Sequence, residues 1–237
     1  MCPPPCEWQN MPEYFYRRVY LEDGYYYPTT AGSILMYVLA IAAVIVAGIA
    51  ISKSTKKTKM SVKQLVFCAV AIALAYLTSY IRLWNMPYGG SVTLCSMMFI
   101  CMIGYFYGLR AGLLTGFAYS ILQFMQEPYV LTFVQVCCDY FLAFTALGLS
   151  GLFAEKKNGM IKGYIVGVIG RGVFAVIAGY VFWSSSMPED FPQAFAWAYP
   201  IWYNGVYLVI EGVLTVIILS LPPVKKAINQ VRATARE

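Results

Sequence analysis

The chain has 237 residues, of which 60% are hydrophobic and only 12% are charged, with a formal net charge of +6. A soluble domain carries about 25% charged residues, so this composition excludes a soluble globular protein. Repeated apolar runs of about 20 residues instead indicate a polytopic helical membrane protein. No histidine is present, which removes the commonest metal ligand and the usual proton relay.

The N-terminal region has two parts. Residues 1–31 are rich in tyrosine and hold no long apolar run, so we expect an extracellular segment. Cys2 and Cys6 could pair or bind a metal, and the sequence leaves both open. Residues 32–59 contain an apolar run at about 32–51 followed by lysines, an order that predicts an extra transmembrane helix with a basic cytoplasmic linker rather than a cleavable signal peptide.

Six further apolar runs predict an all-α membrane domain over residues 60–223. The expected spans lie at about 64–84, 91–108, 111–125, 130–152, 163–183 and 198–221. Residues 224–237 form a basic tail. Basic loops stay in the cytoplasm, whereas the intervening loops carry Glu127, Glu189 and Asp190. The pattern predicts an extracellular N-terminus and a cytoplasmic C-terminus.

Three charged residues lie well inside the predicted spans: Asp139, Arg171 and Glu211. Arg82 lies near the outer end of the first span and can reach the surface. A charge within a membrane is costly and indicates function by default. Asp139 and Arg171 could instead form a structural ion pair between two helices. Glu211 has few polar neighbours in its own span, and we expect it to be structural. No span offers paired carboxylates, a metal-binding set or a nucleophile with its base, so we expect no catalytic residue and no enzyme.

Asp139 has surroundings that favour a binding site. Gln135 precedes it by four residues, which places both side chains on one helix face. Aromatic and amide side chains gather on the same outer side: Tyr129, Tyr140, Trp183, Trp197, Tyr199, Trp202, Tyr203 and Asn204. An acid, an amide and aromatic faces predict a pocket for a flat organic cation. The alternative is an aromatic belt at the membrane interface.

Several motifs give the chain a family resemblance. They are PYGGSVTLCSMM at 87–98, YGLRAGLLTGFAYSIL at 107–122, EPYVLTFVQVCCDY at 127–140, RGVFAVIAGYVFW at 171–183 and AYPIWYNG at 198–205. In this order, residues 60–221 resemble the thiamine-specific S components (ThiT) of energy-coupling factor (ECF) vitamin transporters. The resemblance implies a six-helix S-component bundle, to which this chain adds one N-terminal transmembrane helix.

The resemblance also implies ligand contacts. Asp139 takes the acidic position that pairs with the ligand, Trp183 and Tyr199 take the stacking positions, and Asn204 takes that of a hydrogen-bonding amide. The full set of expected substrate-binding residues is Glu127, Tyr129, Gln135, Asp139, Tyr140, Trp183, Tyr199 and Asn204. Ala175 stands where the family often has a histidine. An S component for a thiamine precursor or another heterocyclic vitamin is therefore the alternative.

The implied partners are a transmembrane EcfT subunit and two ECF ATPases. The chain has no GxxxxGK[ST] loop and cannot hydrolyse ATP itself. Small residues allow helices to approach closely, so we expect docking through Ala69, Ala71, Ala73 and Ala75. Besides thiamine and membrane lipid, we expect no cofactor, metal or nucleic acid. An alternative of another class is a membrane receptor or structural protein that works through its N-terminal segment.

Overall fold

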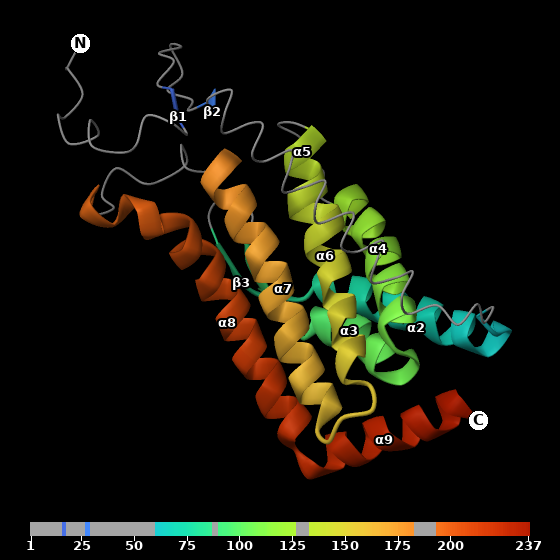
Figure 1. The fold of residues 1–237 in the computed structure, drawn as a ribbon. Helices are drawn as coiled ribbons and strands as arrows, with labels where there is room; N and C mark the ends of the chain where they lie inside the picture. The colour runs from blue at the N-terminus through green and yellow to red at the C-terminus, as the bar shows by residue number, and fades with distance from the viewer. Residues whose placement is uncertain (1–15, 18–26, 29–59, 87–89, 127–132, 183–192) are drawn as a thin grey trace.

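The computed structural model describes residues 16–17, 27–28, 60–86, 90–126, 133–182 and 193–237. Helices dominate these ranges (Figure 1), as the all-α prediction requires. Two short strands, β1 (Tyr16–Arg17) and β2 (Tyr27–Pro28), pair antiparallel in the N-terminal region. The predicted extra helix at 32–51 lies outside the described residues.

The first described helix, α2 (Val62–Ser79), begins with a capping box. The Ser61 hydroxyl accepts a hydrogen bond from the Gln64 backbone N–H, and the Gln64 side chain accepts one from the Ser61 backbone N–H. The helix ends five residues before the predicted end of span one. The chain then forms an antiparallel hairpin of β3 (Arg82–Asn85) and β4 (Ser91–Thr93). Span two was predicted to begin at about 91, and the hairpin corrects this boundary.

Two helices follow the hairpin, α3 (Ser96–Tyr107) and α4 (Leu109–Gln126). They meet at Gly108, whose φ of 87° lies in a region that favours glycine. One residue is therefore enough to reverse the chain between them. The α3 helix has 12 residues, which is shorter than the predicted span, because β4 takes the first part of that apolar run.

The fourth span changes its helix type along its length. It runs through α5 (Phe133–Val136), the π-helical segment η3 (Cys137–Leu142), α6 (Ala143–Thr145) and the 3-10 segment η4 (Ala146–Phe153). Its lower part packs closely on α4: a Cβ atom added to Gly148 would lie 2.3 Å from the Leu113 backbone nitrogen. Asp139 falls in the π-helical segment, a feature that is frequent at functional sites.

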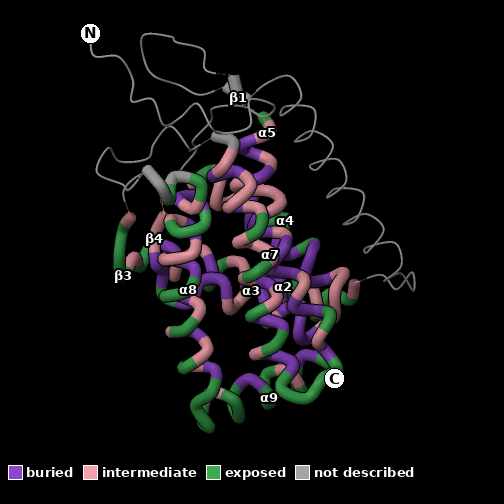
Figure 2. Tube along the Cα trace, turned by 60° about the vertical axis from the view of Figure 1, so that its left-hand side comes forward, coloured by how far each residue is buried: buried purple, intermediate pink, exposed green. Residues whose placement is uncertain are grey.

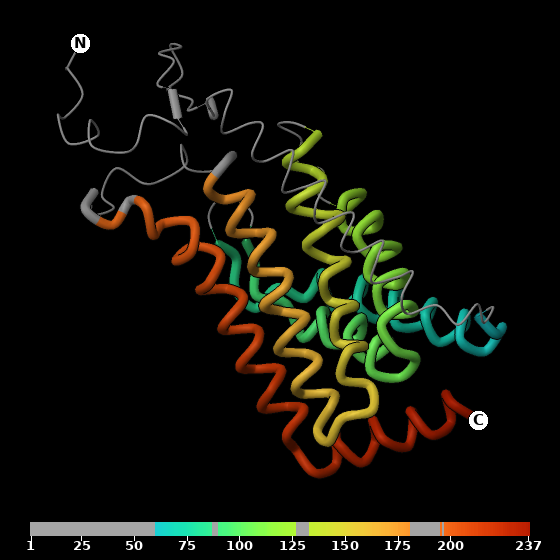
Figure 3. Tube along the Cα trace, viewed as in Figure 1, coloured from blue at the N-terminus to red at the C-terminus, as the bar shows by residue number. Residues whose placement is uncertain are grey.

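The last two spans are α7 (Gly159–Phe182) and α8 (Tyr199–Ser220), the second preceded by η6 (Gln193–Ala198). They pack side by side, and α9 (Pro222–Arg236) runs across the base of the bundle beneath α2 (Figures 1 and 3). The predicted basic tail is thus helical. Its Val224, Ile228 and Ala235 face the bundle or are half-buried, while Lys225 and Lys226 are exposed.

Two arginines fix α9 to the neighbouring turns. Arg236 donates from Nη2 to Glu155 Oε1 at 2.6 Å and from Nε to the Phe106 carbonyl at 2.8 Å. Arg232 donates to the Ala154 carbonyl and stacks over the Tyr105 ring at 4.2 Å. These contacts close the bundle at the end that carries the basic loops.

Four helical stretches in the described ranges are long and apolar enough to cross a membrane. They are Val62–Ser79, Phe133–Phe153, Gly159–Tyr180 and Tyr199–Ser220. Large apolar side chains are exposed on them, such as Leu65, Val173 and Val213, while the buried core lies between the helices (Figure 2). An exposed apolar surface on spanning helices suits lipid contact. These features are those of a multi-pass membrane protein.

Candidate ligand-binding site

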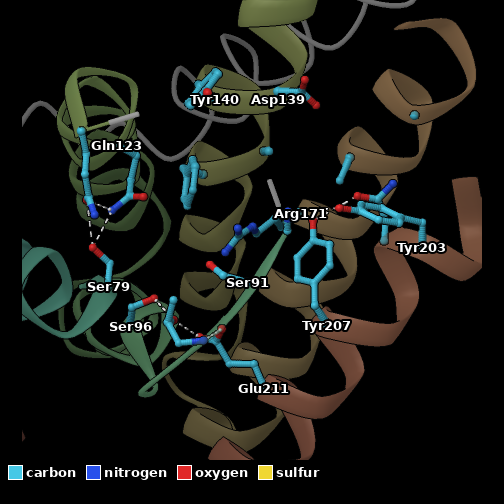
Figure 4. Close-up of a pocket in the computed structure, with 18 of the residues that line it drawn as sticks. Ser79, Ser91, Ser96, Gln123, Asp139, Tyr140, Arg171, Tyr203, Tyr207 and Glu211 are labelled. Atoms are coloured by element: carbon cyan, nitrogen blue, oxygen red, sulfur yellow. Dashed lines mark hydrogen bonds between the residues drawn. The ribbon is translucent and has the colours of Figure 1, made fainter. Parts of the chain in front are cut away.

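A cavity of about 520 Å³ lies in the end of the bundle away from α9. Residues of α2, β4, α4, η3, α7 and α8 line it (Figure 4). Small-molecule sites typically have volumes of about 300–1,000 Å³. The cavity therefore has the size of a site for a small organic molecule.

The acidic residue Asp139 lies at one end of this cavity (Figure 4). Gln135, which is 1% exposed, donates from Nε2 to Asp139 Oδ2 at 2.7 Å, so the predicted shared face is confirmed. Tyr140 also lines the cavity, and its ring packs edge-to-face against Phe124 with centroids 5.2 Å apart. The carboxylate and the aromatic ring are thus both held in place by neighbours in the bundle.

The first turns of α8 supply an aromatic wall. Tyr199 and Tyr203 lie with ring centroids 5.9 Å apart, and both line the cavity with Tyr207. Asn204 is held from two sides: its Nδ2 donates to the Pro200 carbonyl at 2.9 Å, and its Oδ1 accepts from the Tyr207 hydroxyl at 3.0 Å. This wall offers aromatic faces beside a fixed amide, as a flat cation requires.

Arg171 and Glu211 also line the cavity, although the sequence analysis did not place either in the ligand site. The Arg171 guanidinium lies 4.3 Å from the centre of the Phe144 ring. Glu211 is 2% exposed and accepts two hydrogen bonds of 2.9 Å from Thr93, one from its backbone N–H and one from its hydroxyl. The polar neighbour of Glu211 comes from the hairpin rather than from its own span. As charged residues inside predicted spans, Arg171 and Glu211 could have been named as candidate site residues. The contact between Glu211 and Thr93 could not have been predicted from helical periodicity.

The predicted site residues fall into two groups. Gln135, Asp139, Tyr140, Tyr199 and Asn204 come together around the cavity. Glu127, Tyr129 and Trp183 lie outside the described residues. Of the wider aromatic set, Tyr203 lines the cavity, whereas Trp197 and Trp202 are 60% and 65% exposed and do not line it. Those two tryptophans fit the alternative of an interfacial belt.

The four alanines of α2 point in different directions. Ala71 and Ala75 are 8% and 0% exposed and belong to the core of the chain's own bundle. Ala69 and Ala73 are exposed on the outer face, one turn apart. Of these four alanines, Ala69 and Ala73 are therefore accessible to a partner helix, because Ala71 and Ala75 are used in internal packing.

Within the described ranges, no cluster of three or more His, Cys, Asp or Glu residues could hold a metal ion. The cavity instead combines carboxylates, amides, hydroxyls and aromatic rings. Such a lining can bind and orient an organic molecule by hydrogen bonds and stacking.

Three comparisons with known proteins all find thiamine transporters. A family model described as thiamine transporter protein matches residues 65–230. The thiamine transporter ThiT of Bacillus subtilis (strain 168) is 33% identical over 156 residues, which cover 58% of this chain and 77% of that protein. ThiT of Lacticaseibacillus paracasei is 26% identical over 175 residues, covering 66% and 82%. A solved structure of ThiT from Listeria monocytogenes shares the fold, with a TM-score of 0.56, 24% identity, and coverage of 68% of this chain and 94% of that one.

Proposed function

The chain belongs to the thiamine transporter protein family, and from this premise we propose that it is the thiamine-specific S component of an ECF-type transporter. Membership makes it a transport protein and not an enzyme. As an S component, it binds the vitamin and passes it to a shared ATP-driven module.

The observation that carries the proposal is the cavity between Asp139 and the aromatic wall of α8. Thiamine is a cation with two flat rings, an aminopyrimidine and a thiazolium, joined by a methylene group, and it carries a hydroxyethyl group on the thiazolium. A carboxylate complements its charge, and the Tyr199 and Tyr203 rings offer faces for stacking. We assign ligand contacts to Gln135, Asp139, Tyr140, Tyr199 and Asn204, and by resemblance also to Glu127, Tyr129 and Trp183.

The distribution of charge supports an extracellular site. Lys156, Lys157, Lys225 and Lys226 are exposed in or next to α9, at the base of the bundle. The cavity is lined by residues of the first turns of α8. In Figure 1 these turns lie at the opposite end of the bundle from α9. Because basic segments stay in the cytoplasm, this arrangement supports an outward-facing cavity and a cytoplasmic C-terminus.

Energy for uptake comes, in this proposal, from an EcfT subunit and two ATPases. The exposed pair Ala69 and Ala73 on α2 offers a surface on which a partner helix can approach closely. Ala71 and Ala75 support this surface from inside by packing against the chain's own core.

The test is direct binding. The full-length protein, extracted in a mild detergent, is examined by native mass spectrometry for retained ligand and by calorimetry with thiamine. We expect one thiamine per chain. Its separate pyrimidine and thiazole alcohols, and riboflavin as another heterocyclic vitamin, serve as competing ligands. If one of these compounds binds tightly and thiamine does not, that compound becomes the proposed ligand. If none of them binds, the result favours the receptor alternative.

A further inference from the structure

Glu211 lies at the end of the cavity away from Asp139, with Arg171 between the two levels in Figure 4. Glu211 lies in the middle of α8, and the residue is only 2% exposed. A buried charge needs compensation by hydrogen bonds or an opposite charge. The groups around the Glu211 carboxylate therefore indicate its role.

Thr93 supplies the first part of this compensation. Its backbone N–H donates to Glu211 Oε2 and its hydroxyl interacts with Oε1, both at 2.9 Å. The Thr93 hydroxyl is also 2.7 Å from the Ser96 hydroxyl, so its orientation is fixed in turn. These contacts hold the carboxylate in one position beside the cavity.

The Met97 backbone contributes a further hydrogen bond to Glu211. An ionised carboxylate accepts about four hydrogen bonds, so about one acceptor position remains beyond those used by Thr93 and Met97. The residue lines the cavity, so that position is available to a molecule inside it. Arg171 lines the same cavity. A polar group inside the cavity can therefore meet both a fixed acceptor, Glu211, and a donor, Arg171.

We infer that Glu211 is a second ligand-binding carboxylate, which accepts a hydrogen bond from the N–H or O–H group at one end of the ligand while Asp139 binds the other end. The inference rests on the proposed thiamine-binding function and extends it to specificity. A cationic ligand that has flat rings and carries hydrogen-bond donors at both ends fits this cavity. A ligand with a donor at one end leaves one buried carboxylate without its partner, which weakens binding.

Two analogues separate the ends of thiamine. In oxythiamine an oxo group replaces the pyrimidine amino group, which turns a donor into an acceptor. In the chloroethyl analogue chlorine replaces the hydroxyl group. Calorimetry with all three compounds on the full chain measures how strongly the protein prefers thiamine over each analogue.

The variant Glu211→Gln keeps the shape of the side chain and can keep both contacts with Thr93. We expect it to bind thiamine about tenfold to hundredfold more weakly, as for loss of a hydrogen bond to a charged group. We also expect it to lose the preference of the parent over one of the analogues. Asp139→Asn should lose the preference over the other analogue. The matched control is Thr215→Val, one turn further along α8, because Thr215 is fully buried and does not line the cavity.

Each result decides the inference. Loss of the same preference in Glu211→Gln and Asp139→Asn, or unchanged preference in Glu211→Gln, would overturn it. A fall in the melting temperature of ligand-free Glu211→Gln with unchanged thiamine affinity would assign the residue to the packing of β4 on α8. If the parent protein binds none of the three compounds, the proposed function itself fails, which the parent titration shows before any variant is compared.

Discussion

Gln135 donates a hydrogen bond of 2.7 Å to Asp139 from the preceding turn of the fourth span. The bond fixes one carboxylate oxygen of Asp139 at the edge of the cavity and crosses from α5 into the π-helical segment. Gln135 itself is uncharged, so this bond positions the Asp139 carboxylate at the cavity.

The first prediction concerns this charge. Asp139→Asn removes the charge and keeps the size of the side chain, so thiamine binding should weaken by about 2 kcal/mol or more, as when one partner of a buried charged pair is removed. Calorimetry measures the change. Glu155→Gln serves as a control, since it removes a carboxylate at the opposite end of the bundle. Equal thiamine affinity in Asp139→Asn and the parent would exclude Asp139 as the ligand's counter-ion.

The second prediction concerns stacking. Tyr199→Ala and Trp183→Ala should each lower thiamine affinity, because an aromatic face over a cation contributes about 0.5–2 kcal/mol. Thiamine should also quench the tryptophan fluorescence of the parent. The exposed Trp197 provides the matched control, and Trp197→Ala should leave the affinity unchanged. Quenching by a different heterocycle but not by thiamine would change the assigned vitamin.

The third prediction follows from the ion pair between Glu155 and Arg236. The hydrogen bond and the charge of Arg236 lower the pKa of Glu155 below its ordinary value, with a further contribution from Arg232. A carboxyl whose pKa is lower in the folded state stabilises that state above its unfolded pKa, and this stabilisation is lost as the pH falls through the folded pKa. The pH window therefore lies at and below the ordinary glutamate pKa of about 4.3.

Melting temperatures between pH 3 and pH 7 test this effect. The parent should melt above Glu155→Gln at neutral pH, and the difference should disappear in the acidic window. The difference should be small, because the Glu155 side chain is 74% exposed. A constant difference between parent and Glu155→Gln across the range would contradict the assignment.

The fourth prediction concerns close packing of η4 on α4. A Cβ atom at Gly148 would lie 2.3 Å from the Leu113 nitrogen and 2.4 Å from the Gly112 carbonyl carbon. These atoms belong to the α4 backbone, which cannot move aside cheaply, so Gly148→Ala should destabilise the protein by about 1–3 kcal/mol. Gly205→Ala is the control, since nothing lies within 4 Å of its added Cβ. Its melting temperature should be equal to or above that of the parent.

Much of the helical architecture could be predicted because an apolar run of about 20 residues must satisfy its backbone within one segment. The predicted spans at 111–125, 163–183 and 198–221 agree with α4, α7 and α8 to within a few residues. The hairpin was missed because its residues form part of a longer apolar run. The helical character of the C-terminal tail was also missed, although Val224, Ile228, Val231 and Ala235 recur at helical spacing.

The candidate site was predictable only where its residues lie near one another in the sequence. Gln135 and Asp139 are four residues apart, and one helix face brings them together. Glu211 and Thr93 are 118 residues apart, and only the packing of α8 against β4 joins them. An intramembrane carboxylate indicates that a partner exists, but local periodicity does not identify it. Asp139, whose partner is near in the sequence, was therefore predicted to lie in the site, whereas Glu211 was not.

The last prediction concerns the docking surface on α2, which the structure divides into an outer and an inner pair of alanines. Ala73→Trp places a large ring on the exposed face, where it separates α2 from a partner helix that needs close approach. Thiamine binding in detergent should survive, because the cavity lies elsewhere, while uptake should be lost in cells that also express EcfT and the two ATPases. Ala71→Trp should behave differently, since Ala71 is 8% exposed within the core and a bulky side chain there disrupts the bundle. It should lower the melting temperature and weaken thiamine binding together. Normal uptake by Ala73→Trp would show that the partner docks on another surface, because a large ring on the docking face would prevent close approach of a partner helix.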